Sequence, residues 1–268
     1  MTKNSIYELS IQVNLNGLSF CILNRSLQRF ELLEHDNFEK QLNPIQTLEA
    51  LKNKLRSLHM KDYDFNTVQV IHQNDLATLV PEDLYEPNNK ADYLKFNSKI
   101  LQTDFIAEDK LAVNKSVNVY IPYVNINNYI FELFGEFVYK HASTILINEL
   151  LQTNFKNDNP TVVINVNPSS FELLVVENRK LLLYNTYEYN SKEDFIYYIL
   201  FVYEQLKLNP EEVPVKFCGN IAKDDDFYDI VYTYIRHVDF LTYRSHLNYK
   251  SILPETESYK HFLILNSF

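Results

Sequence analysis

Short apolar runs of strand length open the chain and are separated by polar turns. Apolar residues dominate at positions 7–13, 18–23 and 27–33. Turn-forming residues separate these runs at positions 14–17 and 24–26, as expected of hairpin connections. The pattern therefore predicts three antiparallel strands joined by two hairpins.

A helix and further strands follow this start. Apolar residues recur at helical spacing up to position 58, with Asn43 placed to cap the helix and Pro44 in its first turn. The other elements predicted in this half are strands at residues 67–71, 76–80, 117–121 and 136–140, a short helical start at 81–84, and helices at 125–133 and 142–152.

The opening order of elements recurs in the second half. Three strands are predicted at residues 161–166, 171–176 and 181–187, then a helix capped by Ser191 with Asp194 in the capping-box position, then a strand at 213–218. A helix at 224–236 and strands at 238–243 and 261–265 complete the chain.

This duplication predicts the domain organisation. The order strand-strand-strand-helix-strand appears twice, and the polar, Asn-rich segment 153–160 separates the two occurrences. We therefore expect an α/β fold of two related lobes, residues 1–157 and 158–268, each a mixed sheet with helices on its faces.

Several stretches of the second half carry a family resemblance. They are residues 169–178 (SSFELLVVEN), 180–185 (KLLLYN), 193–198 (EDFIYY) and 216–221 (KFCGNI). In them the chain resembles a bacterial family catalogued as domain of unknown function 3822, which has an actin-like ATPase fold. The doubled element order is similar to that of the wider actin, sugar-kinase and chaperone superfamily, whose ribonuclease H-like lobes clasp ATP between them. Type IV pilus assembly proteins of this fold share the general layout, an analogy that carries no function.

Glycine is scarce, and its scarcity argues against a nucleotide site. The chain of 268 residues contains 3 glycines, Gly17, Gly135 and Gly219. Loops that surround phosphate use glycine to bring backbone N–H groups close to the ligand. Neither a G-x-G-x-x-G pattern nor a Walker A motif can be written with these three residues.

The resemblance implies where a nucleotide would bind. Active superfamily members carry Asp-x-Gly on the first hairpin of each lobe, where the aspartate holds a hydrated metal ion. The matching tripeptides are Asn14-Leu15-Asn16 and Asn165-Val166-Asn167, flanked by Gly17 and Ser169. An amide oxygen lacks the negative charge that magnesium prefers. We therefore expect both phosphate turns to be degenerate, and we predict no metal ion, no cofactor and no catalytic residue.

A third motif of active members, a Gly-Gly turn that contacts adenosine, corresponds to Cys218-Gly219-Asn220. One of the two glycines remains, Gly219, followed by Asn220. A vestigial turn is the favoured interpretation over adenosine binding.

Charge and targeting signals bear on partners and location. The formal net charge is −10, which disfavours nucleic acid because affinity for phosphates depends on lysine and arginine. The N-terminus is polar and no apolar run is long enough to cross a membrane. Cys21 and Cys218 each lie in an apolar run, which predicts buried free thiols. These features indicate a cytoplasmic protein.

The function expected from these patterns is that of a non-catalytic actin-like pseudo-ATPase, acting as a protein-interaction or scaffold protein. An ATP-binding or ATP-hydrolysing protein with altered phosphate loops is the alternative. Tyr198 and Tyr228 fall off the main apolar stripes of their helices, which makes them candidate contact residues for a protein partner. Aromatic stripes are more often core, and the partner and oligomeric state stay open.

Overall fold

The chain forms two compact units. The computed structural model describes residues 5–96, 98–153, 155, 160–243 and 246–268. Unit 1 comprises the described residues of Met1–Leu146, Ser245–Pro254 and Ile264–Phe268, and unit 2 those of Ile147–Arg244 and Glu255–Leu263. The predicted lobe boundary, between residues 157 and 158, lies outside the described residues. The prediction placed all of 158–268 in the second lobe, whereas two C-terminal segments group with unit 1.

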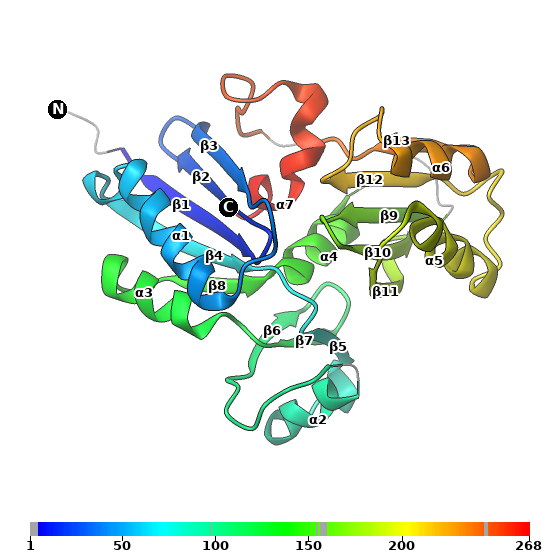
Figure 1. The fold of residues 1–268 in the computed structure, drawn as a ribbon, viewed down its shortest axis with the longest axis horizontal. Coiled ribbons are helices and arrows are strands. Elements are labelled where there is room, and N and C mark those ends of the chain that lie inside the picture. Colours follow the sequence, from blue (N-terminus) through cyan, green and yellow to red (C-terminus); the bar gives the residue numbers. More distant parts are fainter. Residues whose placement is uncertain (1–4, 97, 154, 156–159, 244–245) are drawn as a thin grey trace. The chain divides into compact units, whose positions relative to one another are not determined.

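Unit 1 is built on a five-stranded sheet of order β3-β2-β1-β4-β8 (Figure 1). β1 pairs antiparallel with β2 and parallel with β4, which is the mixed sheet that the sequence predicts. The third strand begins two residues later than predicted, because Leu27 and Gln28 form the turn before it. The strands are β1 Tyr7–Asn14, β2 Gly17–Asn24, β3 Arg29–Asn37, β4 Phe65–His72 and β8 Val138–His141.

Helices and a small second sheet complete unit 1. Helix α1 (Pro44–Ser57) begins with the predicted cap, since Asn43 Oδ1 accepts the Gln46 N–H and Gln46 Oε1 accepts the Asn43 N–H. The small sheet has the order β5-β7-β6. Strand β6 is not predicted from the sequence, because its central residues Glu-Asp-Lys are all charged and show no apolar alternation. The remaining elements are β5 Ala77–Pro81, β6 Ala107–Leu111, β7 Ser116–Tyr120, α2 Lys90–Lys95, α3 Val124–Phe134, α4 Ala142–Gln152 and the 3-10 helices η1 Met60–Asp62, η2 Glu82–Leu84 and η3 Pro87–Asn89.

Unit 2 repeats the topology of the larger sheet in unit 1. Its five strands have the order β11-β10-β9-β12-β13, with β9 antiparallel to β10 and parallel to β12. Ser191 caps α5, since its Oγ accepts the Asp194 N–H at 3.1 Å. The duplicated strand-strand-strand-helix-strand order is thus confirmed. The elements are β9 Thr161–Val166, β10 Ser170–Glu177, β11 Lys180–Glu188, α5 Lys192–Gln205, β12 Val215–Gly219, α6 Asp226–Tyr234 and β13 Val238–Phe240.

The C-terminal strand predicted at residues 261–265 is wrong. The segment forms the 3-10 helix η4 (Glu255–His261) and the short helix α7 (Phe262–Leu265). The run Phe-Leu-Ile-Leu is apolar throughout and buried on every side. A short run without alternation carries no period from which helix and strand can be told apart.

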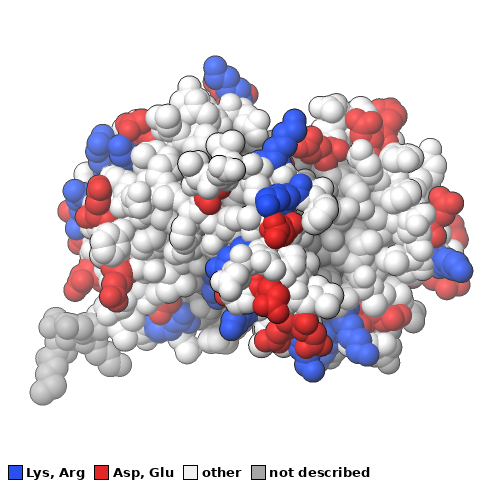
Figure 2. Space-filling view, turned by 90° about the horizontal axis from the view of Figure 1, so that it is seen from below, with Lys and Arg blue, Asp and Glu red and all other residues white. Residues whose placement is uncertain are grey.

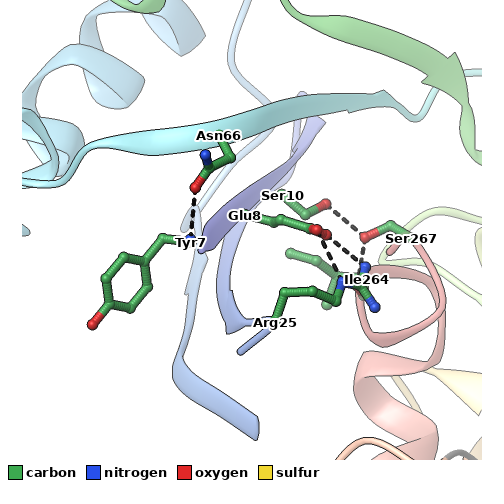
Figure 3. A network of polar contacts seen from close by, with 7 residues as sticks. All are labelled: Tyr7, Glu8, Ser10, Arg25, Asn66, Ile264 and Ser267. Carbon is green, nitrogen blue, oxygen red and sulfur yellow. Dashed lines mark hydrogen bonds and ion pairs between the residues drawn. The ribbon is translucent and has the colours of Figure 1, made fainter. Parts of the chain in front are cut away.

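The end of the chain is fastened to β1 within unit 1 (Figure 3). Ser267 Oγ lies 2.7 Å from both Ser10 Oγ and the Ile264 carbonyl. Beside it, Arg25 forms a bidentate ion pair with Glu8, with N–O distances of 2.9 and 2.6 Å. The Ser267–Ser10 hydrogen bond joins the last residues to β1, in agreement with their grouping with unit 1.

Each unit has its own apolar core. In unit 1 one face of the large sheet packs against α1 and α3, and in unit 2 the corresponding face packs against α5 and α6. Cys21 and Cys218 are buried free cysteines, as predicted. Within the described ranges, the helices are too short or too polar to span a membrane.

Candidate functional site

The first hairpin turn, between β1 and β2, is held by hydrogen bonds inside unit 1. Asn14 Oδ1 accepts the Asn16 N–H at 2.7 Å. The carbonyls of Leu15 and Asn16 accept the N–H groups of Leu42 and Phe38, each at 2.8 Å. The side chain at the expected metal-binding position thus serves to shape its own turn.

Gly17 follows this turn and is required by the sheet. A Cβ atom at this position would lie 2.6 Å from the backbone oxygen of Asp36 on β3. Real Cβ atoms do not approach a backbone oxygen that closely, so a side chain here would push β3 away from β2. The packing of β3 accounts for this glycine without a phosphate.

The second hairpin turn, between β9 and β10, is closed by Tyr189. The Asn167 N–H is donated to the Ser170 carbonyl at 2.8 Å, and the Tyr189 hydroxyl is donated to the Asn167 carbonyl at 2.6 Å. The Tyr189 N–H also reaches the Ser169 carbonyl at 3.1 Å. Three bonds therefore hold the residues that correspond to the second phosphate turn.

Asn165, at the second expected aspartate position, is buried and paired with a carboxylate. It is 3 % exposed, and its Nδ2 donates to Glu172 Oε2 at 2.7 Å across the β9–β10 pair. Tyr184 donates its hydroxyl to the other Glu172 oxygen at 3.0 Å, and Cys218 Sγ lies 3.5 Å from Asn165 Oδ1. Burial raises the pKa of Glu172, and the hydrogen bonds from Asn165 and Tyr184 oppose that rise.

Glu172 is not among the site residues predicted from the sequence. The signal was present, because this residue is the one charged side chain between Phe171 and Val176 in a strand that is otherwise apolar. A charged residue buried in a strand requires hydrogen-bonding partners. Such a residue indicates a polar cluster even before the partners are known.

Gly219, the remnant of the expected adenosine turn, also has a structural reason. Its φ is +83°, and a Cβ atom would lie 2.4 Å from the Val166 carbonyl oxygen and 2.7 Å from Asn165 Oδ1. The next residue, Asn220, donates its N–H to the same Val166 carbonyl at 2.8 Å. Glycine is needed here so that β12 can lie close to β9 at its end.

Magnesium nucleotide does not fit the residues at these positions. Asn14 and Asn165 offer uncharged oxygens where a hydrated divalent cation requires carboxylates. The carboxylate nearest to them in unit 2, Glu172, is buried and already holds two donors. No group of three or more histidine, cysteine or acidic side chains in the part of the chain that the structure describes could hold a metal ion.

Comparisons with known proteins identify the family. Residues 1–238 match the family described as protein of unknown function, DUF3822. The chain belongs to this family. No curated protein matches it in sequence.

Solved structures show the fold of this family member. A Bacteroides thetaiotaomicron protein with actin-like ATPase fold and unknown function is similar, with a TM-score of 0.80, 22 % identity and coverage of 90 % of this chain and 92 % of that one. The PilM–PilN type IV pilus biogenesis complex gives a TM-score of 0.59 at 10 % identity over 97 % and 96 %. The ethanolamine utilization protein EutJ from Carboxydothermus hydrogenoformans gives 0.51 at 8 % identity over 90 % and 86 %. The chain has the actin-like ATPase fold.

The predicted exposure of two tyrosines needs correction in this DUF3822 protein. Tyr228 is 6 % exposed, and its ring packs against Phe217 and Phe240. The buried face of α6 includes Tyr228 and Val231. The prediction that Tyr228 lies off the buried face of this helix is therefore wrong. Tyr198 is half-buried and stacks on Tyr187 with ring centroids 4.8 Å apart. The aromatic residues exposed on α5 and α6 are Tyr197, Phe201, Tyr232 and Tyr234.

Unit 1 contains two buried histidines that sequence spacing did not connect. His72 and His141 lie side by side at the ends of β4 and β8, and both are fully buried. The Nδ1 atom of His72 accepts the Tyr123 N–H at 3.3 Å, and that of His141 accepts the Ser143 N–H at 3.2 Å. An Nδ1 atom that accepts a backbone N–H carries no proton, so both rings are neutral.

Acid is expected to destabilise unit 1 because of these two rings. Burial lowers the pKa of His72 to about 4 and that of His141 to about 3. The unfolded chain binds a proton at each histidine below about pH 6.5, so the folded state loses about 2 kcal/mol per histidine by pH 5. Urea unfolding at pH 7 and pH 5 measures this loss.

A variant separates the histidines from other acid effects. In His72→Asn the amide oxygen can still accept the Tyr123 N–H, and the loss between pH 7 and pH 5 should fall by about half. Asp109, whose pKa is raised by burial, acts in the opposite direction and cannot produce the loss. A change in stability between pH 7 and pH 5 that is the same in His72→Asn as in the unmodified protein would refute the assignment.

Proposed function

We propose that this actin-like protein is non-catalytic and acts by binding a protein partner. The observation that carries the proposal is the state of Asn165: the side chain at the second aspartate position is buried and committed to Glu172. The side chain of Asn14 likewise makes a hydrogen bond within its own turn, where it accepts the Asn16 N–H. Both positions have exchanged a charge that binds metal for an amide that holds local structure.

The glycines support the same proposal. Gly17 and Gly219 fall where phosphate and adenosine turns would need small residues, yet close backbone approaches to Asp36 and Val166 require them. Neither glycine therefore counts as evidence for a nucleotide. The packing of the strands is a sufficient reason for both glycines.

The surface supports a protein partner over a nucleic acid. The net charge is −10, and on the face seen in Figure 2 basic side chains are interspersed with acidic ones. Tyr197 and Tyr232 are both 62 % exposed, and exposed tyrosine is enriched at protein interfaces. PilM, which has a similar fold, occurs in a complex with PilN, so this fold is compatible with such a role.

Titration with magnesium ATP tests the non-catalytic half of the proposal. The expected result is no saturable heat at millimolar nucleotide. The alternative function, ATP binding through rearranged ligands, has Glu172 as its best candidate ligand because its carboxylate faces the lost aspartate position. Under that alternative, binding would depend on magnesium and would be lost in Glu172→Gln.

A further inference from the structure

A small hollow lies at the end of α1 in unit 1, beside α3 (Figure 1). Its volume is about 230 Å³, and Leu55, Tyr129 and Leu133 form its apolar lining. A cavity of about 150 Å³ is large enough for a benzene ring, whereas sites for drug-sized ligands begin near about 300 Å³. The hollow therefore has the size for one apolar side chain and not for a whole cofactor.

The apolar lining of the hollow is held by contacts within unit 1. Leu55 is 3 % exposed and belongs to the core beneath α1 and α3, against which Tyr129 and Leu133 pack. Lys52 Nζ lies 5.4 Å from the centroid of the Tyr129 ring, and an ion pair with Glu49 at 2.7 Å holds it there. An apolar wall that is already ordered reduces the entropy lost when a ligand binds.

Positive charge surrounds this apolar lining. The segment 52–61 (KNKLRSLHMK) carries four lysine or arginine residues and no acid, in a chain whose net charge is −10. Arg56 and Lys61 line the hollow and are exposed, and neither forms an ion pair with an acid in the part of the chain that the structure describes. Asp62, the acid of the lining, has a side chain that is 78 % exposed and lies 3.9 Å from His59 Nδ1. Arg56 and Lys61 therefore leave positive charge available to a ligand.

Unit 2 provides an internal comparison, because α5 ends in the same way as α1. Each helix has a leucine at its C-terminal cap, followed by a residue with positive φ, His59 at 52° and Lys207 at 55°. Two residues before the cap, α1 has Arg56 where α5 has Glu204, and the last turn of α5 contains no basic residue. The end of such a helix thus does not require a basic side chain, which favours a binding role for Arg56.

We propose that the hollow binds an acidic segment of a protein partner. One apolar side chain of the partner, aromatic or branched, occupies the hollow, and carboxylates beside it in the partner's sequence pair with Arg56 and Lys61. Arginine is enriched at protein interfaces and binds a carboxylate through two parallel hydrogen bonds. Phosphates of a nucleic acid would meet the same two cations, but the apolar lining and the net charge of −10 disfavour that ligand.

This site deepens the interaction role proposed above and rests on that role. A displayed library of short peptides tests it on the full chain. In the library the central residue is Phe, Leu or Ala, and the flanking residues are drawn from Asp, Ser and Lys. We expect the unmodified protein to enrich peptides with Phe or Leu at the centre and Asp beside it at least roughly tenfold over peptides with Ala or Lys at these places.

Two double variants locate the binding site. Arg56→Glu/Lys61→Glu places negative charge opposite the carboxylates of the peptide, and the dissociation constant of the enriched peptides, measured by fluorescence anisotropy, should rise more than roughly tenfold. Lys40→Glu/Lys99→Glu makes the same change in net charge at exposed positions of unit 1 that do not line the hollow. This control should change the constant by less than about threefold, because salt screens distant exposed charges. Circular dichroism confirms that each variant is folded.

Three results would overturn this assignment of the hollow. The first is a library from which the unmodified protein enriches no acidic peptide, and the second is enrichment that Arg56→Glu/Lys61→Glu retains or that the control variant loses equally. The third is enrichment that is indifferent to Phe, Leu or Ala at the centre, since the apolar lining would then have no part in binding. None of these results bears on the titration with magnesium ATP, so the site can fail while the non-catalytic half of the proposed function stands.

Discussion

Gly219→Ala is expected to destabilise unit 2 by about 2–5 kcal/mol. The φ of +83° costs an alanine about 1–2 kcal/mol by itself. Its Cβ would also lie 2.4 Å from the Val166 carbonyl oxygen, and forcing apart two packed strands adds about 1–3 kcal/mol. The expected measurement is a large fall in the urea midpoint by circular dichroism, since the chain has no tryptophan to report unfolding.

Gly135→Ala is the matched control for this prediction. Gly135 has a φ of +78°, but a Cβ there meets nothing within 4 Å. Only the backbone strain of about 1–3 kcal/mol should remain. If the two variants were equally stable, the close approach of β12 to β9 would not be the reason for Gly219, and a ligand-related reason would regain support.

Asn165→Asp is expected to cost about 3–5 kcal/mol at pH 8. The substitution restores the aspartate of active superfamily members, but it places a second carboxylate 2.7 Å from Glu172 Oε2 in a buried site. The two acids cannot both be ionised there, so the cost should shrink as acid supplies a shared proton. Urea unfolding at pH 8 and pH 5 measures both the cost and its decrease.

Two variants identify the cause of this cost. Asn14→Asp makes the same change in the first hairpin, where the new carboxylate can still accept the Asn16 N–H, and it should alter stability by less than about 1 kcal/mol. Asn165→Asp/Glu172→Gln removes the repulsion and should recover most of the loss. A single Asn165→Asp variant as stable as Asn14→Asp would contradict the role given to Glu172.

The order of strands and helices could be predicted because it depends on local sequence patterns. The strand runs with their turn residues predict both hairpins, and the caps at Asn43 and Ser191 predict the starts of α1 and α5. Asn14 and Asn165, which the family resemblance matches to the aspartates of active members, lie at the ends of strands that the sequence predicts; that these positions no longer bind nucleotide stays a prediction.

The features that could not be predicted depend on tertiary contacts. The partner of Asn165 is Glu172, seven residues away on another strand, and no periodicity connects the two. The burial of Tyr228 depends on the rings of Phe217 and Phe240. His72 and His141 are directly opposite each other on neighbouring strands, although 69 residues (141 − 72) separate them along the chain. Spacing along the chain could therefore not reveal this pair.

Both lobes carry the same features near their first hairpin. The same turn position carries asparagine in both lobes, and in each lobe the nearby glycine is explained by a close backbone approach. The close backbone approaches at Gly17 and at Gly219 are separate observations, one in each unit, and both explain the glycine in the same way. Local contacts therefore account for both turns and both glycines without a bound nucleotide, in agreement with the proposed function.

Isothermal titration calorimetry with ATP, in the presence and absence of magnesium, measures whether either hairpin turn still contributes to nucleotide binding. If both turns are purely structural, we expect heats no larger than those of dilution in both titrations, up to millimolar nucleotide, for protein shown by circular dichroism to be folded. Saturable, magnesium-dependent binding with a micromolar dissociation constant would contradict it.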